Sequence, residues 1–164
     1  MLLREQFDIV KQMIDDNEYL LESLRGNDNQ TLLMKVAWLR SSFYSFKFLI
    51  EFPQDFSVVN FTEWNIIHYI VVDVYDDDDS ALMMLKSLRD EITRETFARL
   101  INHLDVNGNS PLHDAAWWNR HNTIKFLIQN GANVNVRNER GELPEEQEQG
   151  CNNETKQLIQ SYRN

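Results

Sequence analysis

The sequence has little cysteine, glycine or positive charge and no long hydrophobic run, and each shortage excludes a class of protein. Among 164 residues there is a single cysteine, Cys151, so no internal disulfide can form, and a reducing compartment is expected. The five glycines are isolated, which excludes a glycine-rich loop that cradles phosphate. No apolar run nears membrane-spanning length, and residues 1–8 are too few and too charged for a signal peptide. A cytoplasmic location is therefore expected, with a nuclear one as the alternative.

Positive charge is the other shortage. The chain has 16 Lys and Arg against 26 Asp and Glu, a formal net charge of −10. Such a balance argues against binding to nucleic acids or anionic membranes and favours a protein partner with a basic patch. The hydrophobic fraction of 42% is too high for a disordered chain, so a packed core is expected.

Catalytic and metal-binding patterns are missing as well. Cys151 has no local nucleophile signature and no serine lies in an elbow motif, so we expect no enzyme activity, no cofactor and no small-molecule substrate. The aspartate run at residues 76–79, with Asp73 nearby, lacks the ligand spacing and glycine of a calcium loop, so no metal is expected there. A run of this kind is usually a solvated acidic loop, and steering of a basic partner is the alternative.

The most informative pattern begins at Asp105. Residues 110–113 read Ser-Pro-Leu-His, residues 115–116 are Ala-Ala, residues 124–128 read Ile-Lys-Phe-Leu-Ile, and residues 131–135 read Gly-Ala-Asn-Val-Asn. This stretch resembles the ankyrin repeat through nearly its whole length. The interval from Gly108 to Gly141 equals the period of that family. The resemblance implies an all-α solenoid of stacked helix–turn–helix units with short β-hairpin fingers.

Weaker copies of the pattern precede and follow this one. The first helices of successive repeats begin at Thr31, Asn65, Ser110 and Leu143. The first and last of the three intervals are close to the family period, whereas the middle one is longer and indicates an insertion of about twelve residues in the second repeat. We therefore expect one array with these parts: an N-terminal cap over 1–25, repeats over 26–59, 60–104 and 105–137, and a C-terminal cap over 138–164.

The insertion and the caps carry their own expectations. Ser80 is expected to cap a helix that begins at Ala81, after an acidic turn. The apolar spacing from Phe97 to Leu104 predicts an additional helix over 94–104, in place of the finger between repeats two and three. A helix over 3–15 is expected to close the N-terminal end. At the other end, glutamates replace Leu-His at 145–146, which favours a polar outer face.

The resemblance also implies which residues face a partner. Positions after the Ala-Ala pair and around the turn glycine vary in the family and contact partners. They map here onto Trp38, Leu39, Trp64, Asp73, Asn109, Trp117 and Trp118. Tryptophan is enriched among interface hot spots, whereas the alternative is that these rings pack between adjacent helices. For His68 and His113 the resemblance implies structural hydrogen bonds between neighbouring turns.

The resulting prediction is a non-enzymatic protein–protein interaction module that binds through its concave face of fingers and first helices. Two more specific alternatives remain open. In length and repeat number the chain is similar to the small cyclin-dependent kinase inhibitors and to a small insect cell-cycle protein of a kinase complex, which suggests a regulator of a protein kinase. Its acidity suggests an inhibitor of a basic transcription factor, as among the inhibitor-of-κB proteins.

Overall fold

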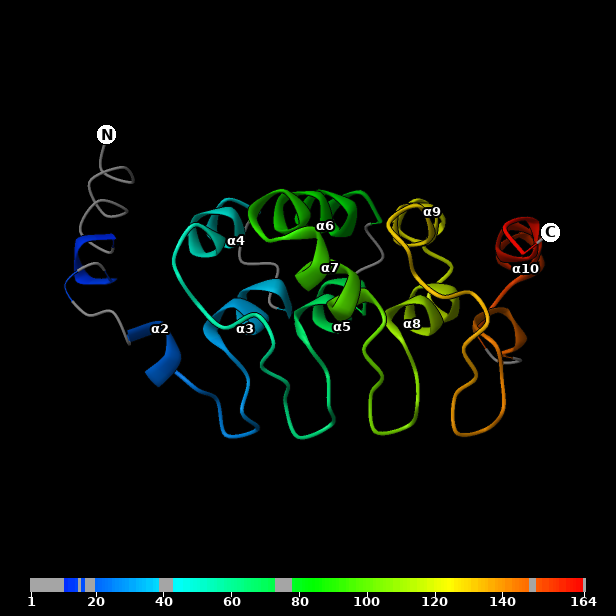
Figure 1. The fold of residues 1–164 in the computed structure, drawn as a ribbon, viewed down its shortest axis with the longest axis horizontal. Coiled ribbons are helices and arrows are strands. Elements are labelled where there is room, and N and C mark those ends of the chain that lie inside the picture. The colour runs from blue at the N-terminus through cyan, green and yellow to red at the C-terminus, as the bar shows by residue number, and fades with distance from the viewer. Residues whose placement is uncertain are drawn as a thin grey trace.

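Two layers of helices run side by side along the molecule. The structure is a computed structural model, and it describes residues 11–14, 16, 20–38, 43–72, 78–147 and 150–163. Figure 1 shows the inner layer above a row of loops and the outer layer above the inner one. The inner layer contains α3 (Leu32–Trp38), α5 (Ile66–Val71), α8 (Pro111–Trp117) and the 3₁₀ helix η1 (Pro144–Glu146). The outer layer contains α4 (Phe43–Ile50), α6 (Asp78–Glu91), α9 (His121–Gln129) and α10 (Asn153–Ser161).

Each inner helix packs against the next inner helix and against its own outer helix. The packed pairs include α3 with α5, α5 with α8, α8 with η1, α4 with α6, and α6 with α9. A short helix, α2 (Leu20–Ser23), precedes the stack, and residues 11–14 are helical as well. Because every helix of the stack buries a face against a neighbouring unit, the stack as a whole is the folding unit. The predicted all-α stack of helix pairs is confirmed.

The pair α8 and α9 shows how local sequence gives this unit. Ser110, in extended conformation, is the N-cap of α8, and Pro111 occupies the first turn, where no amide partner is needed. Ala115 and Ala116 are fully buried, which allows close approach of the neighbouring helices. After α9, Gly131 adopts a φ of 97°, and the amide of Ala132 donates to the carbonyl of Leu127, 2.9 Å away. This left-handed cap ends the helix and directs the chain back to the inner layer.

Of the two helices predicted for the insertion, one is present as expected and the other begins earlier than expected. The helix expected over 94–104 is present as α7 (Arg94–Ile101), and Thr93 caps it by accepting from the amide of Thr96 at 3.2 Å. The start expected at Ala81 is wrong, because α6 begins at Asp78 and Ser80 lies inside it. Acidic residues in a first turn are stabilised by the positive end of the helix dipole, so the end of the aspartate run joins the helix.

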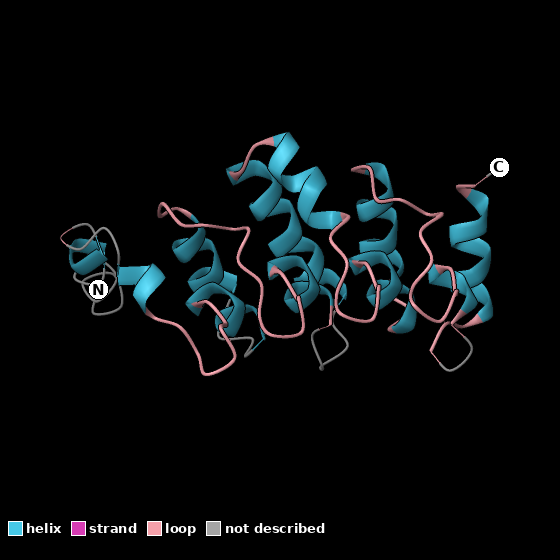
Figure 2. Cartoon of the chain, turned by 60° about the horizontal axis from the view of Figure 1, so that its bottom comes forward, coloured by secondary structure: helices cyan, strands magenta, loops and turns pink. Residues whose placement is uncertain are grey.

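The loops below the inner layer include four fingers, comprising residues 26–30, 60–64, 105–109 and 138–142. The prediction that α7 replaces the third finger is wrong, because residues 105–109 form a turn like the others. No strand occurs in the described residues, as Figure 2 shows, so the fingers are not β-hairpins in the strict sense. Neighbouring fingers are joined by single amide–carbonyl bonds, which are too few for a strand ladder.

The C-terminal end differs from its prediction at one glutamate. Glu145 does not lie on a polar outer face, since its exposed fraction is only 3%. It occupies the position of the buried Leu112 in the preceding repeat, and the guanidinium of Arg163 pairs with its carboxylate. A buried carboxylate needs an oppositely charged partner, and here Arg163 supplies the positive charge. The N-terminal helix expected over 3–15 lies mostly outside the described residues.

Candidate functional site

The four fingers share one internal geometry. In each, the amide of the first residue donates to the carbonyl of the fifth at 2.9–3.1 Å. The fourth residue is left-handed in every finger, with φ of 66° at Asn29, 63° at Glu63, 74° at Gly108 and 76° at Gly141. The fingers therefore place corresponding residues at equivalent positions along the molecule.

Successive fingers are also joined in a fixed register. The amide of the second residue in one finger donates to the carbonyl of the third residue in the finger before it. The pairs are Phe61 to Asp28 at 3.2 Å, Val106 to Thr62 at 3.1 Å, and Glu139 to Asn107 at 2.9 Å. The fingers thus form a continuous row, which Figure 1 shows along the bottom of the stack.

The motif histidines, His68 and His113, reach from the inner helices to main-chain carbonyls of the fingers. Nδ1 of His113 accepts from the amide of Ser110 at 3.1 Å, so its proton is on Nε2, which donates to the carbonyl of Glu142 at 3.1 Å. Nε2 of His68 lies 3.4 Å from the carbonyl of Asn109. Both contacts reach the next finger, as the resemblance implied for these histidines. Burial lowers the pKa of both, that of His68 to about 4, so both are neutral at physiological pH.

Three aromatic side chains form a cluster between the first two repeats. The ring centroids of Trp38 and Trp64 lie 6.0 and 5.7 Å from that of Tyr69, and both rings meet Tyr69 nearly edge-on. Tyr69 is 2% exposed, whereas Trp38 remains 37% exposed. Nε1 of Trp64 donates to Asp105 of the third finger at 3.2 Å. Trp64 is therefore held on both sides, and Trp38 is the solvent-facing member of the cluster.

The two tryptophans at the end of α8 differ from one another. Trp118 is 40% exposed. Trp117 is partly buried, and its indole covers the backbone of Gly150 so closely that a Cβ on that glycine would lie 2.4 Å from the ring. The structure therefore gives Trp117 a packing role against the C-terminal end and leaves Trp118 accessible.

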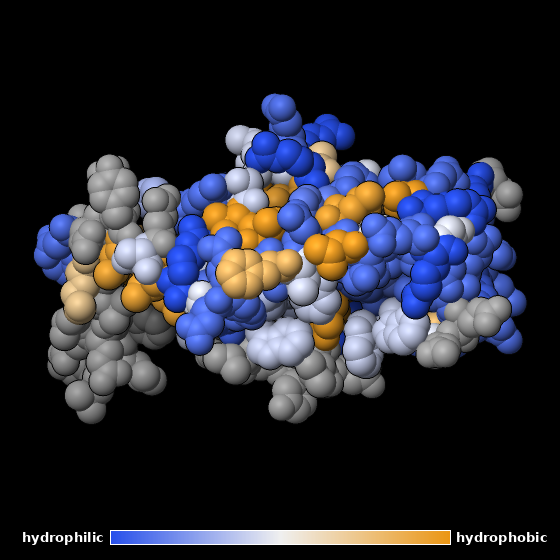
Figure 3. Space-filling view, turned by 90° about the horizontal axis from the view of Figure 1, so that it is seen from below, coloured by the Kyte–Doolittle hydropathy of each residue, from blue (hydrophilic) through white to orange (hydrophobic). Residues whose placement is uncertain are grey.

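The remaining residues predicted from the sequence are Leu39, Asp73 and Asn109. Leu39 and Asp73 lie outside the described residues. Asn109 lies in the third finger and lines a pocket between the third and fourth fingers. Phe61 and Val106, at equivalent positions of neighbouring fingers, are 73% and 48% exposed. Figure 3 shows hydrophobic residues gathered over the middle of the finger side, with a second group at the left end of the view.

Sequence reasoning missed two residues that join neighbouring units of the stack. The carboxylate of Asp78 accepts from the amides of Asn122 and Thr123 at 2.7 and 3.0 Å, so it caps the next repeat's α9. Asn119 binds the C-terminal end: it donates to the carbonyl of Gly150 and accepts from the amide of Asn152, both at 2.8 Å.

The described residues offer little to catalytic or metal chemistry. No group of three or more His, Cys, Asp or Glu side chains among them could hold a metal ion. Burial raises the pKa of the Cys151 thiol to about 11, which disfavours the nucleophilic thiolate. In the same part of the chain no helix is both long enough and apolar enough to cross a membrane. The surface of fingers and inner helices remains the candidate site.

Comparison with known proteins identifies the repeat. Residues 107–139 match the family described as "Ankyrin repeat". A segment of 77 residues, 46% of the chain, is 36% identical to the human transient receptor potential cation channel subfamily A member 1, of which it covers 7%. A segment of 44 residues, 27% of the chain, is 46% identical to ankyrin repeat protein OPG189 of monkeypox virus, of which it covers 8%. The chain thus spans less than a tenth of these curated relatives.

Proposed function

Since the chain carries an ankyrin repeat and its helix pairs stack as ankyrin repeats do, we propose that it is a non-enzymatic module that binds a protein partner through its fingers and inner helices. The observation that carries the proposal is the exposure of two tryptophans, Trp38 and Trp118, at the ends of inner helices α3 and α8. Both stand at positions where the family varies and contacts its partners.

The energetic argument rests on the indole. A tryptophan buries a large apolar area on binding and loses little conformational entropy, so it is over-represented among residues whose truncation costs about 2 kcal/mol or more. Trp38 is fixed by Tyr69 and Trp64 before any partner arrives. A preorganised ring forfeits less freedom on binding than a mobile one. Asn109, Trp64 and the exposed Phe61 and Val106 extend the proposed surface along the fingers.

The proposal extends to the partner's charge. A formal net charge of −10 favours encounter with a basic surface and raises the association rate. Because exposed charges are screened over about 8–10 Å at physiological ionic strength, that rate should fall as salt is added. A protein kinase with a basic patch or a basic transcription factor would each meet this charge requirement, in the cytoplasm or the nucleus. The identity of the partner decides between these two alternatives.

The test combines capture with matched variants. Partners captured from cell extract by the wild-type chain are identified by mass spectrometry and compared with those retained by Trp38→Ala, Trp118→Ala and Tyr44→Ala. Tyr44 is the control because it is an aromatic residue, 76% exposed, on outer helix α4. A partner of the proposed surface is lost with either tryptophan variant and kept with Tyr44→Ala.

Two results would overturn the proposal. One is a set of partners indifferent to both tryptophans although the variants remain folded by circular dichroism. The other is turnover of a substrate by the purified chain that survives replacement of Trp38 and Trp118. For any partner identified, association rates at low and physiological salt then test the charge argument.

A further inference from the structure

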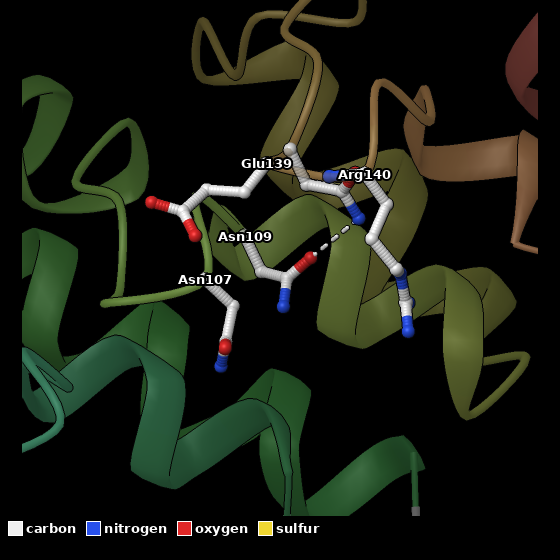
Figure 4. A pocket seen from close by; sticks show the side chains of 5 residues that line it. Asn107, Asn109, Glu139 and Arg140 are labelled. Atoms are coloured by element: carbon white, nitrogen blue, oxygen red, sulfur yellow. Dashed lines mark hydrogen bonds between the residues drawn. The ribbon is translucent and has the colours of Figure 1, made fainter.

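A polar pocket separates the third and fourth fingers. Its volume is about 400 Å³, and it is lined by Asn107, Asn109, Asn138, Glu139 and Arg140. That volume lies in the usual range for small-ligand sites, although the lining here is polar. Figure 4 shows the side chains of Asn107, Asn109 and Arg140 extending toward the same side of the two fingers.

The orientation of the amides in this pocket follows from the main chain. Asn138 is 6% exposed, and its Oδ1 accepts from the amides of Arg140 and Glu142, both at 3.0 Å. Main-chain amides only donate, so this atom must be the oxygen, and Nδ2 points the other way. That Nδ2 donates to Oδ1 of Asn109 at 3.0 Å. The Nδ2 group of Asn109 is thereby left facing away from Asn138.

A count of donors and acceptors shows an excess of donors. Nδ2 of Asn138 donates both of its hydrogens, one to Asn109 and one to the carboxylate of Glu142. Arg140 donates from Nε to Glu142 at 2.8 Å, and its side chain is 64% exposed. Within the described residues, Nδ2 of Asn109, the side chain of Asn107 and the terminal nitrogens of Arg140 make no hydrogen bond.

Glu139, the acidic residue that lines the pocket, does not accept from these donors. In Figure 4 the side chain of Glu139 extends to the left, whereas that of Arg140 extends downward. Oε2 of Glu142 already accepts from both Asn138 and Arg140. The available groups are therefore one guanidinium end and two carboxamide NH₂ groups, which together suit an anionic acceptor with more than one oxygen.

We infer that the pocket between the third and fourth fingers binds a carboxylate from an aspartate or glutamate side chain of the protein partner. The guanidinium of Arg140 supplies the charge, and the amides of Asn107 and Asn109 donate to the carboxylate oxygens. The inference rests on the proposed function and refines it. The partner must carry, besides a basic surface for encounter, one acidic side chain seated between these fingers.

Carboxylate is favoured over a main-chain carbonyl for a physical reason. Hydrogen bonds between charged groups are roughly twice as strong as neutral ones, and a guanidinium presents its donors in a fork that matches two carboxylate oxygens. The chain's overall negative charge opposes an approaching anion at long range. This repulsion is screened beyond about 8–10 Å at physiological salt, so the contacts within the pocket decide binding there.

The inference is tested by titrating the ¹⁵N-labelled full chain with small probes at physiological ionic strength, observed by NMR. Acetyl-glutamate amide supplies a side-chain carboxylate, acetyl-glycine supplies a terminal carboxylate, and acetyl-glutamine amide is the neutral isostere. We expect acetyl-glutamate amide to shift the side-chain NH₂ signals of Asn107 and Asn109 saturably, with at least threefold tighter binding than the glutamine probe. Equal binding of the two would overturn the carboxylate assignment, and so would the absence of any shift.

The decisive variant is Asn109→Asp. An aspartate keeps an oxygen for Nδ2 of Asn138 but replaces the pocket-facing NH₂ by a second oxygen, so binding of acetyl-glutamate amide should weaken at least tenfold. Asn133→Asp is the matched control, since it makes the same charge change in an exposed turn whose amide contact, Asn135 to Oδ1 of Asn133 at 2.9 Å, an aspartate preserves. Arg140→Gln should weaken binding at least threefold. Undiminished binding in Asn109→Asp would refute the inference.

These outcomes are separable from those of the proposed function. If Asn109→Asp binds partners normally while Trp118→Ala loses them, the module stands and the carboxylate site does not contribute. If the probes bind as expected but no partner depends on either tryptophan, the pocket stands and the proposed surface fails. Tighter binding of acetyl-glycine than of acetyl-glutamate amide would overturn the side-chain source and favour a chain terminus.

Discussion

The close backbone approach between the last two fingers gives the most quantitative prediction. Gly108 lies at the turn of the third finger with a φ of 74°, and a Cβ added there would lie 2.9 Å from the amide nitrogen of Glu139 and 3.2 Å from two backbone atoms of Asn138. Gly141 occupies the equivalent place in the last finger, with a φ of 76°, and nothing lies within 4 Å of its added Cβ. The effects of Gly108→Ala and Gly141→Ala on the free energy of unfolding therefore differ only in the steric contact of the added Cβ.

The shared term is backbone strain. A non-glycine residue in the left-handed region costs roughly 1–2 kcal/mol, and the smaller unfolded-state entropy of alanine returns about 0.4–1 kcal/mol of that. Gly141→Ala should therefore lower the free energy of unfolding by about 1 kcal/mol. Gly108→Ala adds an overpacking term of about 1–3 kcal/mol, because its contacts are backbone atoms that no rotamer change can relieve. We expect a total loss of about 2–4 kcal/mol.

The assay is urea unfolding at room temperature, followed in parallel by far-UV circular dichroism and tryptophan fluorescence. Coincident transitions and equal m-values are needed, since repeat arrays can lose cooperativity. Equal destabilisation by the two substitutions would refute the close packing of the third and fourth fingers. In that case the pocket beside Asn109 would also lose its structural basis, because both features depend on the bond from Glu139 to Asn107.

Four further substitutions test other parts of the array. Glu63→Gly should raise the free energy of unfolding by about 1 kcal/mol in urea titration, because Glu63 is a non-glycine residue at a φ of 63°. The folded-state pKa of His68, about 4, lies below its unfolded value near 6.5, so the unfolded chain binds the extra proton. Stability from this group should be fully present above about pH 6.5 and decline toward pH 4, by up to ~3 kcal/mol, and His68→Gln should flatten that slope in unfolding titrations at several pH values. Trp117→Ala should lower the melting temperature by several degrees because its indole covers Gly150, whereas Trp118→Ala should leave it nearly unchanged; the reverse order would contradict the roles given to them.

The third repeat could be predicted from sequence because its determinants are local. The cap at Ser110, the proline after it, the alanine pair and the glycine after α9 each act within a few residues of their own position. His113 reaches the next finger, yet its role follows from the motif and the repeat spacing. The helix over Arg94–Ile101 was likewise visible, because amphipathic spacing depends only on neighbouring residues.

Two of the failures share a different cause, which is contact between residues distant in sequence. The start of α6 at Asp78 depends on that carboxylate meeting the amides of Asn122 and Thr123, which belong to the outer helix of the next repeat. The burial of Glu145 depends on Arg163, just after the last helix. In isolation an aspartate run and a glutamate pair both indicate solvated surface. Only the stacked structure supplies the partners that bring these acids into the packing.

The tryptophans connect the proposed recognition surface with the stability of the array. Trp64 bonds to the third finger, Trp38 packs on Tyr69 of the next repeat, and Trp117 covers Gly150 at the C-terminal end, so each indole reaches beyond its own repeat. In a linear stack, stability is approximately a sum of unit terms and nearest-neighbour terms. A partner that spans Trp38 and Trp118 would bridge repeats one to three and add its binding free energy to those neighbour terms. By mass action such a partner at 100 times its Kd would stabilise the folded array by about 2.7 kcal/mol, comparable with the loss expected from Gly108→Ala. If the proposed surface binds the partner, binding and stacking depend on the same residues, and the partner-bound array should be the more cooperative state.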